Sequence, residues 1–176
     1  MKDKVAYAAT RRFSFHSHQY SYLFIKFIHT FSQVHPYQQV KVAYTCRSSL
    51  LVKETIIRCH PKFHGRTRND VVLVTLPDGR HVFARLQFVF TCEAFNRDWQ
   101  LSLVTLFKTA ITPEDSRIGM RKILEEEKTS AFIDVGWIRR SVYAVPDFND
   151  IQGKFFTIID VVDADMYLRL HNLNII

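Results

Sequence analysis

The sequence predicts a mainly β domain of the α+β class: a small, partly open β-barrel or bent antiparallel sheet with an N-terminal helix packed against it. Three consecutive segments, 69–76, 80–90 and 99–107, are rich in the β-branched, aliphatic and aromatic residues that strands favour. Pro77-Asp78-Gly79 joins the first two, with Pro fixing φ and Gly accepting the positive φ of a tight turn. The 15 Phe and 7 Tyr residues also favour strands.

Alternation of apolar residues predicts that the second and third segments share one buried face. Side chains two positions apart on a strand point to the same side of the sheet. Three strands with a common apolar face make a plausible sheet nucleus. The residues assigned to this face are Val82, Ala84, Leu86, Phe88 and Phe90, together with Trp99, Leu101, Leu103, Thr105 and Phe107.

The chain of 176 residues is long enough for one domain with a substantial core. We expect a flexible basic N-terminus over 1–18, an amphipathic helix over 19–35 and a β-rich domain over 38–172. The helix follows from spacings of three and four, which place one apolar stripe along a helical face. An interfacial or targeting helix is the alternative interpretation. The stripe consists of Tyr20, Leu23, Phe24, Phe27, Ile28 and Phe31.

The remaining segments are assigned from alternation and from capping and turn residues. We expect strands over 38–46, 50–59, 131–145 and 154–163, with Gly136 marking a bulge or bend. Residues 60–68 are predicted to form a loop, and 166–171 a terminal turn or strand. A short helix over 113–127 is predicted because Thr112 can cap it, Pro113 suits its first turn, and acidic residues follow.

The net charge of +7 is concentrated at the N-terminus. Residues 1–50 hold seven basic side chains and one acidic side chain, whereas 51–176 hold 17 basic and 16 acidic ones. Such an arm can bind nucleic acid or an anionic surface, or can be a solvated tail. Its scarcity of acids is also typical of a mitochondrial presequence. Three cysteines without close spacing indicate a reducing, intracellular compartment, and no apolar run is long enough to span a membrane.

The predicted loop 60–68 is the strongest candidate for nucleic-acid contact. Basic side chains surround an aromatic ring there, and such a combination can bind a phosphate backbone and stack a base. A solvated surface loop is the alternative. The candidate residues are Lys62, Phe63, His64, Arg66 and Arg68, with Arg11 and Arg12 of the N-terminal arm as additional contacts.

Two groups of residues suggest a metal, and neither has the spacing of an established motif. Asp160, Asp163 and Asp165 could form a carboxylate cluster for a metal-dependent nuclease, although such residues more often face water at a strand end. The sequence contains no nucleophile elbow, P-loop or dinucleotide fingerprint, so it predicts no cofactor and no small-molecule substrate. The weak zinc candidates are Cys59, His60, His64, His81 and Cys92.

Several segments over about residues 40–172 resemble, in the same order along the chain, the C-terminal region of fungal transposon-encoded proteins. The family is that of the basidiomycete cut-and-paste transposases of the Plavaka, Kyakuja–Dileera–Zisupton and CACTA-like groups. The segments that carry the resemblance include Arg58-Cys-His-Pro-Lys-Phe-His-Gly65, Arg68-Asn-Asp-Val-Val-Leu-Val74, Arg97-Asp-Trp-Gln-Leu-Ser-Leu-Val104, Trp137-Ile-Arg-Arg-Ser-Val-Tyr143 and Asp163-Ala-Asp-Met-Tyr-Leu-Arg169.

The resemblance implies an accessory module, because the RNase-H-like acidic core of those transposases has no counterpart in this sequence. No catalytic residue is carried over, and the implied location is the nucleus. The strand order is also similar to the bromo-adjacent homology barrel of chromatin proteins. The leading hypothesis is therefore a non-enzymatic DNA-binding or chromatin-binding module. The alternatives are a protein-interaction module of a transposase complex and a metal-dependent nuclease.

Overall fold

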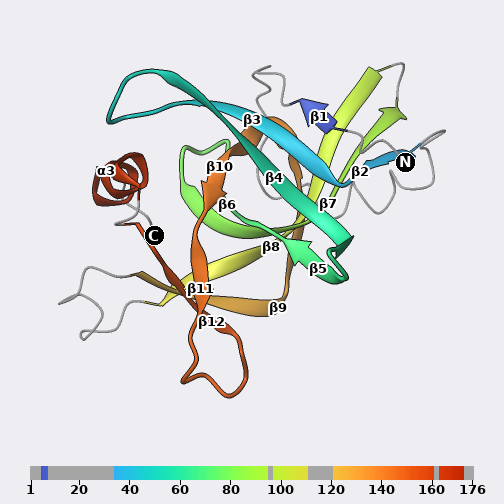
Figure 1. The fold of residues 1–176 in the computed structure, drawn as a ribbon. Helices are drawn as coiled ribbons and strands as arrows, with labels where there is room; N and C mark the ends of the chain where they lie inside the picture. Colours follow the sequence, from blue (N-terminus) through green and yellow to red (C-terminus); the bar gives the residue numbers. More distant parts are fainter. Residues whose placement is uncertain (1–4, 8–33, 95–96, 111–120, 161–162, 173–176) are drawn as a thin grey trace.

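A computed structural model describes residues 5–7, 34–94, 97–110, 121–160 and 163–172, which form two β-sheets and one α-helix (Figure 1). The smaller sheet is antiparallel except where its first strand runs parallel to the second. In spatial order its strands are β1 (Val5–Tyr7), β3 (Gln39–Thr45), β4 (Val52–Phe63) and β5 (Arg66–Asn69).

The larger sheet is antiparallel throughout and contains the three strands that the sequence predicts as its nucleus. One further strand, β2 (Val34–Tyr37), pairs with residues Val89–Cys92 of β7. In spatial order the other strands are β10 (Ile138–Val142), β6 (Val71–Thr75), β7 (His81–Ala94), β8 (Arg97–Ala110), β9 (Arg121–Asp134), β12 (Phe155–Ile158) and β11 (Ala144–Pro146).

The mainly β prediction is confirmed. The two edge strands of the larger sheet, β10 and β11, are separated in sequence only by Tyr143. The sheet is therefore bent so strongly that its two edges come close together. Among the described residues, however, no ladder pairs β10 with β11, and the sheet is not a closed barrel. Helix α3 (Ala164–Asn172) completes the described fold.

β-Bulges bend the long central strands and alter which side chains are buried. The register between β7 and β8 shifts between Leu86 and Phe88. The prediction that 82–90 present one continuous apolar face is therefore wrong beyond the bulge. Val89 joins the buried cluster of Ala84 and Leu86, whereas Phe88 is 39% exposed. Phe90 is buried, but it packs against Phe88 and Phe132 and not in that cluster. A second shift, between Thr105 and Phe107, bends β8 against β9. A bulge adds one residue to one strand, and so reverses the in–out alternation beyond it.

Two hydrophobic clusters lie on opposite faces of the larger sheet. The first fills the space between the sheets and includes Val40 and Ile57 from the smaller one. The second lies on the far face, where Met166 and Leu170 of α3 pack with residues of β6, β7, β9 and β12. Because β6 alternates between the two clusters, four of its five residues are buried, as in strands covered on both faces.

Three predicted elements are wrong in the described residues. Of the predicted helix 113–127, residues 113–120 lie outside the described residues, and 121–127 belong to β9, where 121–124 pair with β12 and 122–125 with β8. Residues 60–68 are not a loop but the end of the β4–β5 hairpin, where the two strands pair. The tail around 166–171 is helical, because Asp163 caps it and its apolar residues reach the second cluster.

The segment 131–145 is not one continuous strand, because a 3-10 turn (Val135–Trp137) interrupts it and confirms the bend expected at Gly136. The predicted helix 19–35 lies almost wholly outside the described residues, and its last two positions belong to β2. Within the stretch 1–18, only Val5–Tyr7 is described, as strand β1. Within the described ranges, no helix has the length and apolar character needed to cross a membrane. All three cysteines are free and buried, as a reducing compartment would allow.

Candidate functional site

The basic segment predicted to contact nucleic acid forms the tip of the β4–β5 hairpin. Phe63 pairs with Arg66, which leaves His64 and Gly65 as a two-residue loop with φ values of 49° and 80°. Positive φ at both central positions matches a type I′ turn, whose twist suits a hairpin. Pro61 lies within the register shift between His60 and Phe63, where a strand tolerates a residue without an N–H.

Phe63 is the centre of the hairpin tip. The guanidinium carbons of Arg58 and Arg68 lie 5.4 and 4.9 Å from its ring centroid. The ring of His64 meets it edge-on at 4.4 Å between centroids. Cation–π attraction therefore orders two arginines around one aromatic ring. The ring is already covered in part by protein groups, which differs from the open stacking surface that the sequence suggested.

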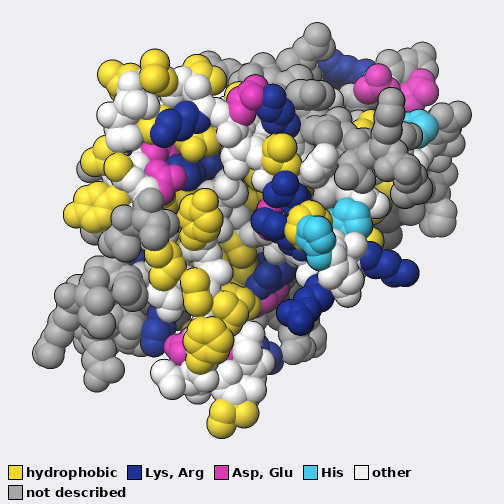
Figure 2. Space-filling view, viewed as in Figure 1, with side chains coloured by type: hydrophobic (Ala, Val, Ile, Leu, Met, Phe, Trp, Pro, Cys, Tyr) yellow, Lys and Arg dark blue, Asp and Glu magenta, His cyan; other side chains and the backbone are white. Residues whose placement is uncertain are grey.

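The cationic groups of the hairpin differ in how far they are neutralised. The Nε of Arg68 donates to the carboxylate of Asp70 over 2.9 Å, and the same carboxylate accepts the Arg58 amide. Lys62 and Arg66 are exposed. Figure 2 shows Lys, Arg and His side chains gathered over the region where Figure 1 places β5. The candidates Arg11 and Arg12 lie outside the described residues.

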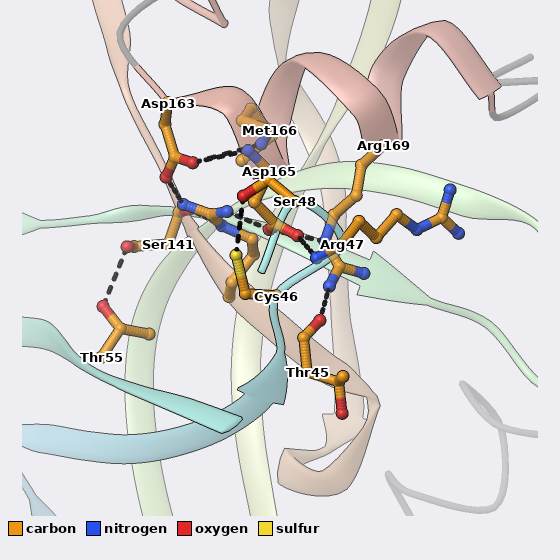
Figure 3. Close-up of polar contacts among 11 residues, drawn as sticks. Thr45, Cys46, Arg47, Ser48, Thr55, Ser141, Asp163, Asp165, Met166 and Arg169 are labelled. Atoms are coloured by element: carbon orange, nitrogen blue, oxygen red, sulfur yellow. Dashed lines mark hydrogen bonds and ion pairs between the residues drawn. The ribbon is translucent and has the colours of Figure 1, made fainter. Parts of the chain in front are cut away.

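Two of the three aspartates considered as a metal cluster, Asp163 and Asp165, lie instead in a network of ion pairs and a helix cap (Figure 3). Asp163 is the N-cap of α3, because its Oδ1 accepts the amide of Asp165 over 2.9 Å and that of Met166 over 3.4 Å. The other oxygen of Asp163 accepts a hydrogen bond from Arg140. Asp160 is buried, and its backbone carbonyl accepts the Asp163 amide over 3.2 Å.

Asp165 is the most enclosed carboxylate of the network, with its side chain 1% exposed. It accepts hydrogen bonds from Arg140, from the backbone amide of Arg47 and, over 2.8 Å, from the Nε of Arg169. Burial alone would raise the pKa of Asp165, but these donors hold it below its usual value. The pKa of Asp163 is lowered in the same way, against the effect of burial.

The five zinc candidates are not brought together as a site. Cys59 and Cys92 are buried, and burial raises the pKa of each thiol to about 11. His60 and His64 lie at the hairpin tip around Phe63, whereas His81 begins β7. Over the ranges that the structure describes, no group of three His, Cys, Asp or Glu side chains is arranged to hold a metal ion.

Sequence reasoning missed a pocket at the opposite end of β4 from the hairpin. It is lined by Tyr44, Thr75, His81, Arg139 and Arg169, among other residues. These residues come from separate strands and from α3, so no spacing in the sequence marks them. The sequence offered two hints: the adjacent Arg139 and Arg140, and a histidine that begins a strand directly after a tight turn.

The chain was also compared with known proteins. No family model, no curated protein sequence and no solved structure matches it.

Proposed function

We propose that this chain is a non-enzymatic binding module for DNA or chromatin, with the β4–β5 hairpin as its contact surface. The observation that carries the proposal is the exposed pair Lys62 and Arg66 beside an arginine–phenylalanine cluster. Lysine and arginine side chains that neutralise phosphates supply most of the affinity of sequence-independent DNA binding. A two-stranded ribbon is also one of the elements that the major groove of DNA admits.

We propose for Phe63 a role different from base stacking. Its ring is flanked by the guanidinium groups of Arg58 and Arg68, so it holds these cations in fixed directions. Pre-ordered arginines lose less side-chain entropy when they meet a phosphate. The ion pair with Asp70 partly neutralises Arg68, so Lys62 and Arg66 make the larger part of the proposed phosphate contact.

The experiment is fluorescence anisotropy of a labelled DNA duplex with the full chain over a series of salt concentrations. The Lys62→Gln/Arg66→Gln variant should bind more weakly and lower the slope of log K against log salt by about 2, because about one counterion is released for each phosphate contact. Arg80→Gln is the matched control, since Arg80 is an exposed arginine of another hairpin, paired with Asp78. Equal binding by all three proteins would contradict the proposal.

The contribution of the N-terminal arm is tested separately. Arg11→Gln/Arg12→Gln should reduce the salt slope further if the arm joins the hairpin on the same DNA. An unchanged slope would confine the contact to the hairpin.

The resemblance to transposon-encoded proteins supports a nuclear accessory module as the setting for this binding function. A partly open barrel similar to the bromo-adjacent homology fold remains part of the same proposal, supported by the bend that brings β10 and β11 together through Tyr143. The nuclease alternative gains nothing from the geometry, because Asp163 and Asp165 face guanidinium groups.

A protein-interaction module is the second candidate, and two exposed apolar side chains favour it. Phe148 is 90% exposed and Ile151 103% exposed in the loop that joins β11 to β12, where Figure 2 shows apolar side chains at the tip. Such residues contribute strongly when a partner buries them. The first partner to test is a second copy of the chain. Concentration-dependent sedimentation that Phe148→Ser/Ile151→Ser abolishes, and that Tyr167→Ser retains, would support this function.

A further inference from the structure

A pocket of about 510 Å³ lies where the tip of the β3–β4 hairpin faces β6, β7, β10 and α3. Its volume is in the range of small-molecule sites. Its lining includes three apolar residues, Val42, Val52 and Ile138, which we call the apolar wall. The remaining wall is rich in hydrogen-bond donors, and none of its described lining residues is acidic.

Arg139 is directed to this pocket by an irregularity of its strand. The register between β10 and β6 shifts between Ile138 and Arg140, so Arg139 occupies the extra position. Its side chain is exposed at the pocket, whereas that of Arg140 is 3% exposed and points into the ion-pair network. Bulges frequently redirect a side chain in this way.

A chain of hydrogen bonds connects Arg139 to His81. The Nε of Arg139 donates to Thr75 Oγ1 over 2.9 Å, and Thr75 Oγ1 lies 2.9 Å from Nδ1 of His81. Both hydrogen bonds form when the Thr75 hydroxyl donates to Nδ1 of His81, which places the imidazole proton on Nε2. In this arrangement the Nη groups of Arg139 and the Nε2–H of His81 take no part in these two hydrogen bonds and can donate to a ligand.

Arg169 supplies a second guanidinium to the same pocket. Asp165 holds its Nε, and one Nη donates to the backbone carbonyl of Thr45, so the side chain is fixed in place and only 13% exposed (Figure 3). The ring of Tyr44, also in the lining, lies 5.7 Å from its guanidinium carbon.

Several cationic groups lie near the pocket. Burial is the main cause that lowers the pKa of His81, and the charges of Arg139, Arg47 and Arg169 lower it further. The pKa of Arg139 is lowered by partial burial and then by Arg169. The two lining arginines therefore repel one another, and a bound anion would relieve that repulsion.

We propose that the pocket binds the phosphate group of a small phosphate monoester, with Arg139 and Arg169 on the phosphate and the apolar wall against the organic part. Guanidinium groups match the geometry and charge of phosphate oxygens. Arg169 already pairs with Asp165, so the phosphate would mainly compensate Arg139, and Arg169 would contribute a hydrogen-bond donor. This site is separate from the proposed DNA contact, because the 12-residue strand β4 spans roughly 35 Å from Val52 to Phe63.

The test is a titration of the full ¹⁵N-labelled chain with inorganic phosphate and with phenyl phosphate, followed by NMR. We expect saturable shifts at Thr75, His81 and Arg139, with phenyl phosphate binding more tightly than inorganic phosphate because its ring contacts the apolar wall. Arg139→Gln should weaken both affinities by roughly ten-fold. Arg80→Gln and Lys62→Gln/Arg66→Gln should leave them unchanged, which separates this site from the DNA-binding hairpin.

Each other result would overturn the proposal or part of it. Shifts at the β4–β5 hairpin without shifts at the pocket would assign the phosphate to the DNA-binding surface. Unchanged affinity in a folded Arg139→Gln variant, verified by its thermal unfolding, would remove Arg139 from the site. Equal affinities for the two phosphates would overturn the role of the apolar wall.

Discussion

Arg140 and Asp165 form an ion pair that is almost completely shielded from solvent, with side chains 3% and 1% exposed. Asp163 binds the other Nη of Arg140, and the ring of Tyr44 lies 4.7 Å from the guanidinium carbon. The network therefore joins three elements far apart in the sequence: β3, β10 and α3. An ion pair of this kind is costly to break, because the remaining charge stays buried.

Asp165→Asn should lower the free energy of unfolding by about 3–5 kcal/mol, because Arg140 would lose its enclosed counter-charge. Urea denaturation followed by circular dichroism measures the change. Asp78→Asn is the control, since Asp78 pairs with Arg80 at an exposed turn, and such pairs contribute at most about 1 kcal/mol. Similar losses in the two variants would show that Arg140 has another source of compensation.

Acid should destabilise the protein through the same two aspartates. Their pKa values in the folded state are below the usual value, so their ionised forms stabilise the fold above the unfolded-state pKa of about 3.9. This contribution is present at neutral pH and is lost as the pH falls through about 4 towards the lower folded values. Urea midpoints measured between neutral pH and pH 3 should decrease less steeply in Asp165→Asn. An unchanged slope would contradict the assignment.

Helix α3 should contribute to global stability through its buried face. Leu170 is 0% exposed in the second hydrophobic cluster, so Leu170→Ala should cost about 2–5 kcal/mol. Tyr167 lies on the same helix and is 45% exposed, and Tyr167→Ala should change stability by less than about 1 kcal/mol. Chemical denaturation distinguishes the two. If Leu170→Ala unfolds at the wild-type midpoint, the helix does not pack on the sheet.

Cys46 should be the most reactive of the three thiols. Hydrogen bonds with the Ser48 and Ser49 side chains lower its pKa to about 6, with its Sγ 3.1 Å from Ser48 Oγ. The thiol is buried, but the turn residues 47–50 that follow it are exposed, so we expect a local opening of this turn to expose it. Iodoacetamide labelling at neutral pH, read by peptide mass spectrometry, should modify Cys46 first.

The serine beside it provides the control for this thiol. Ser48→Ala should slow the labelling of Cys46, because less thiolate is then present at neutral pH. Cys59 and Cys92 should stay unmodified until the protein unfolds, since burial raises both pKa values to about 11. Simultaneous labelling of all three thiols would show that global unfolding governs the reaction.

Local sequence signals predicted the elements whose neighbours in space are also neighbours in sequence. The Pro77-Asp78-Gly79 turn is present: the Gly79 amide donates to the Leu76 carbonyl over 2.9 Å, and Gly79 has φ 85°. The alternation in 80–90 was sufficient to assign a strand, but it could not reveal the bulge after Leu86, because a bulge depends on the register with β8.

The incorrect predictions concern segments whose structure is decided by distant partners. Residues 121–127 follow a good helix start, yet they form the strand between β8 and β12. The nine residues of α3 are too few to form a stable helix alone, and their packing on the second cluster determines it. The arginine pocket was not predictable for the same reason, since its lining residues meet only when the two sheets and α3 have assembled.

The position of β6 between β7 and β10 has a consequence for synthesis of the chain. Its first neighbour follows within a few residues, but its second neighbour is made only when the ribosome reaches residues 138–142. Until then one edge of an apolar strand is unpaired, and such edges recruit other chains. We therefore expect folding of the larger sheet to finish late, after a slow search for a distant partner. A nascent chain that stops before β10 would be the form most prone to aggregate.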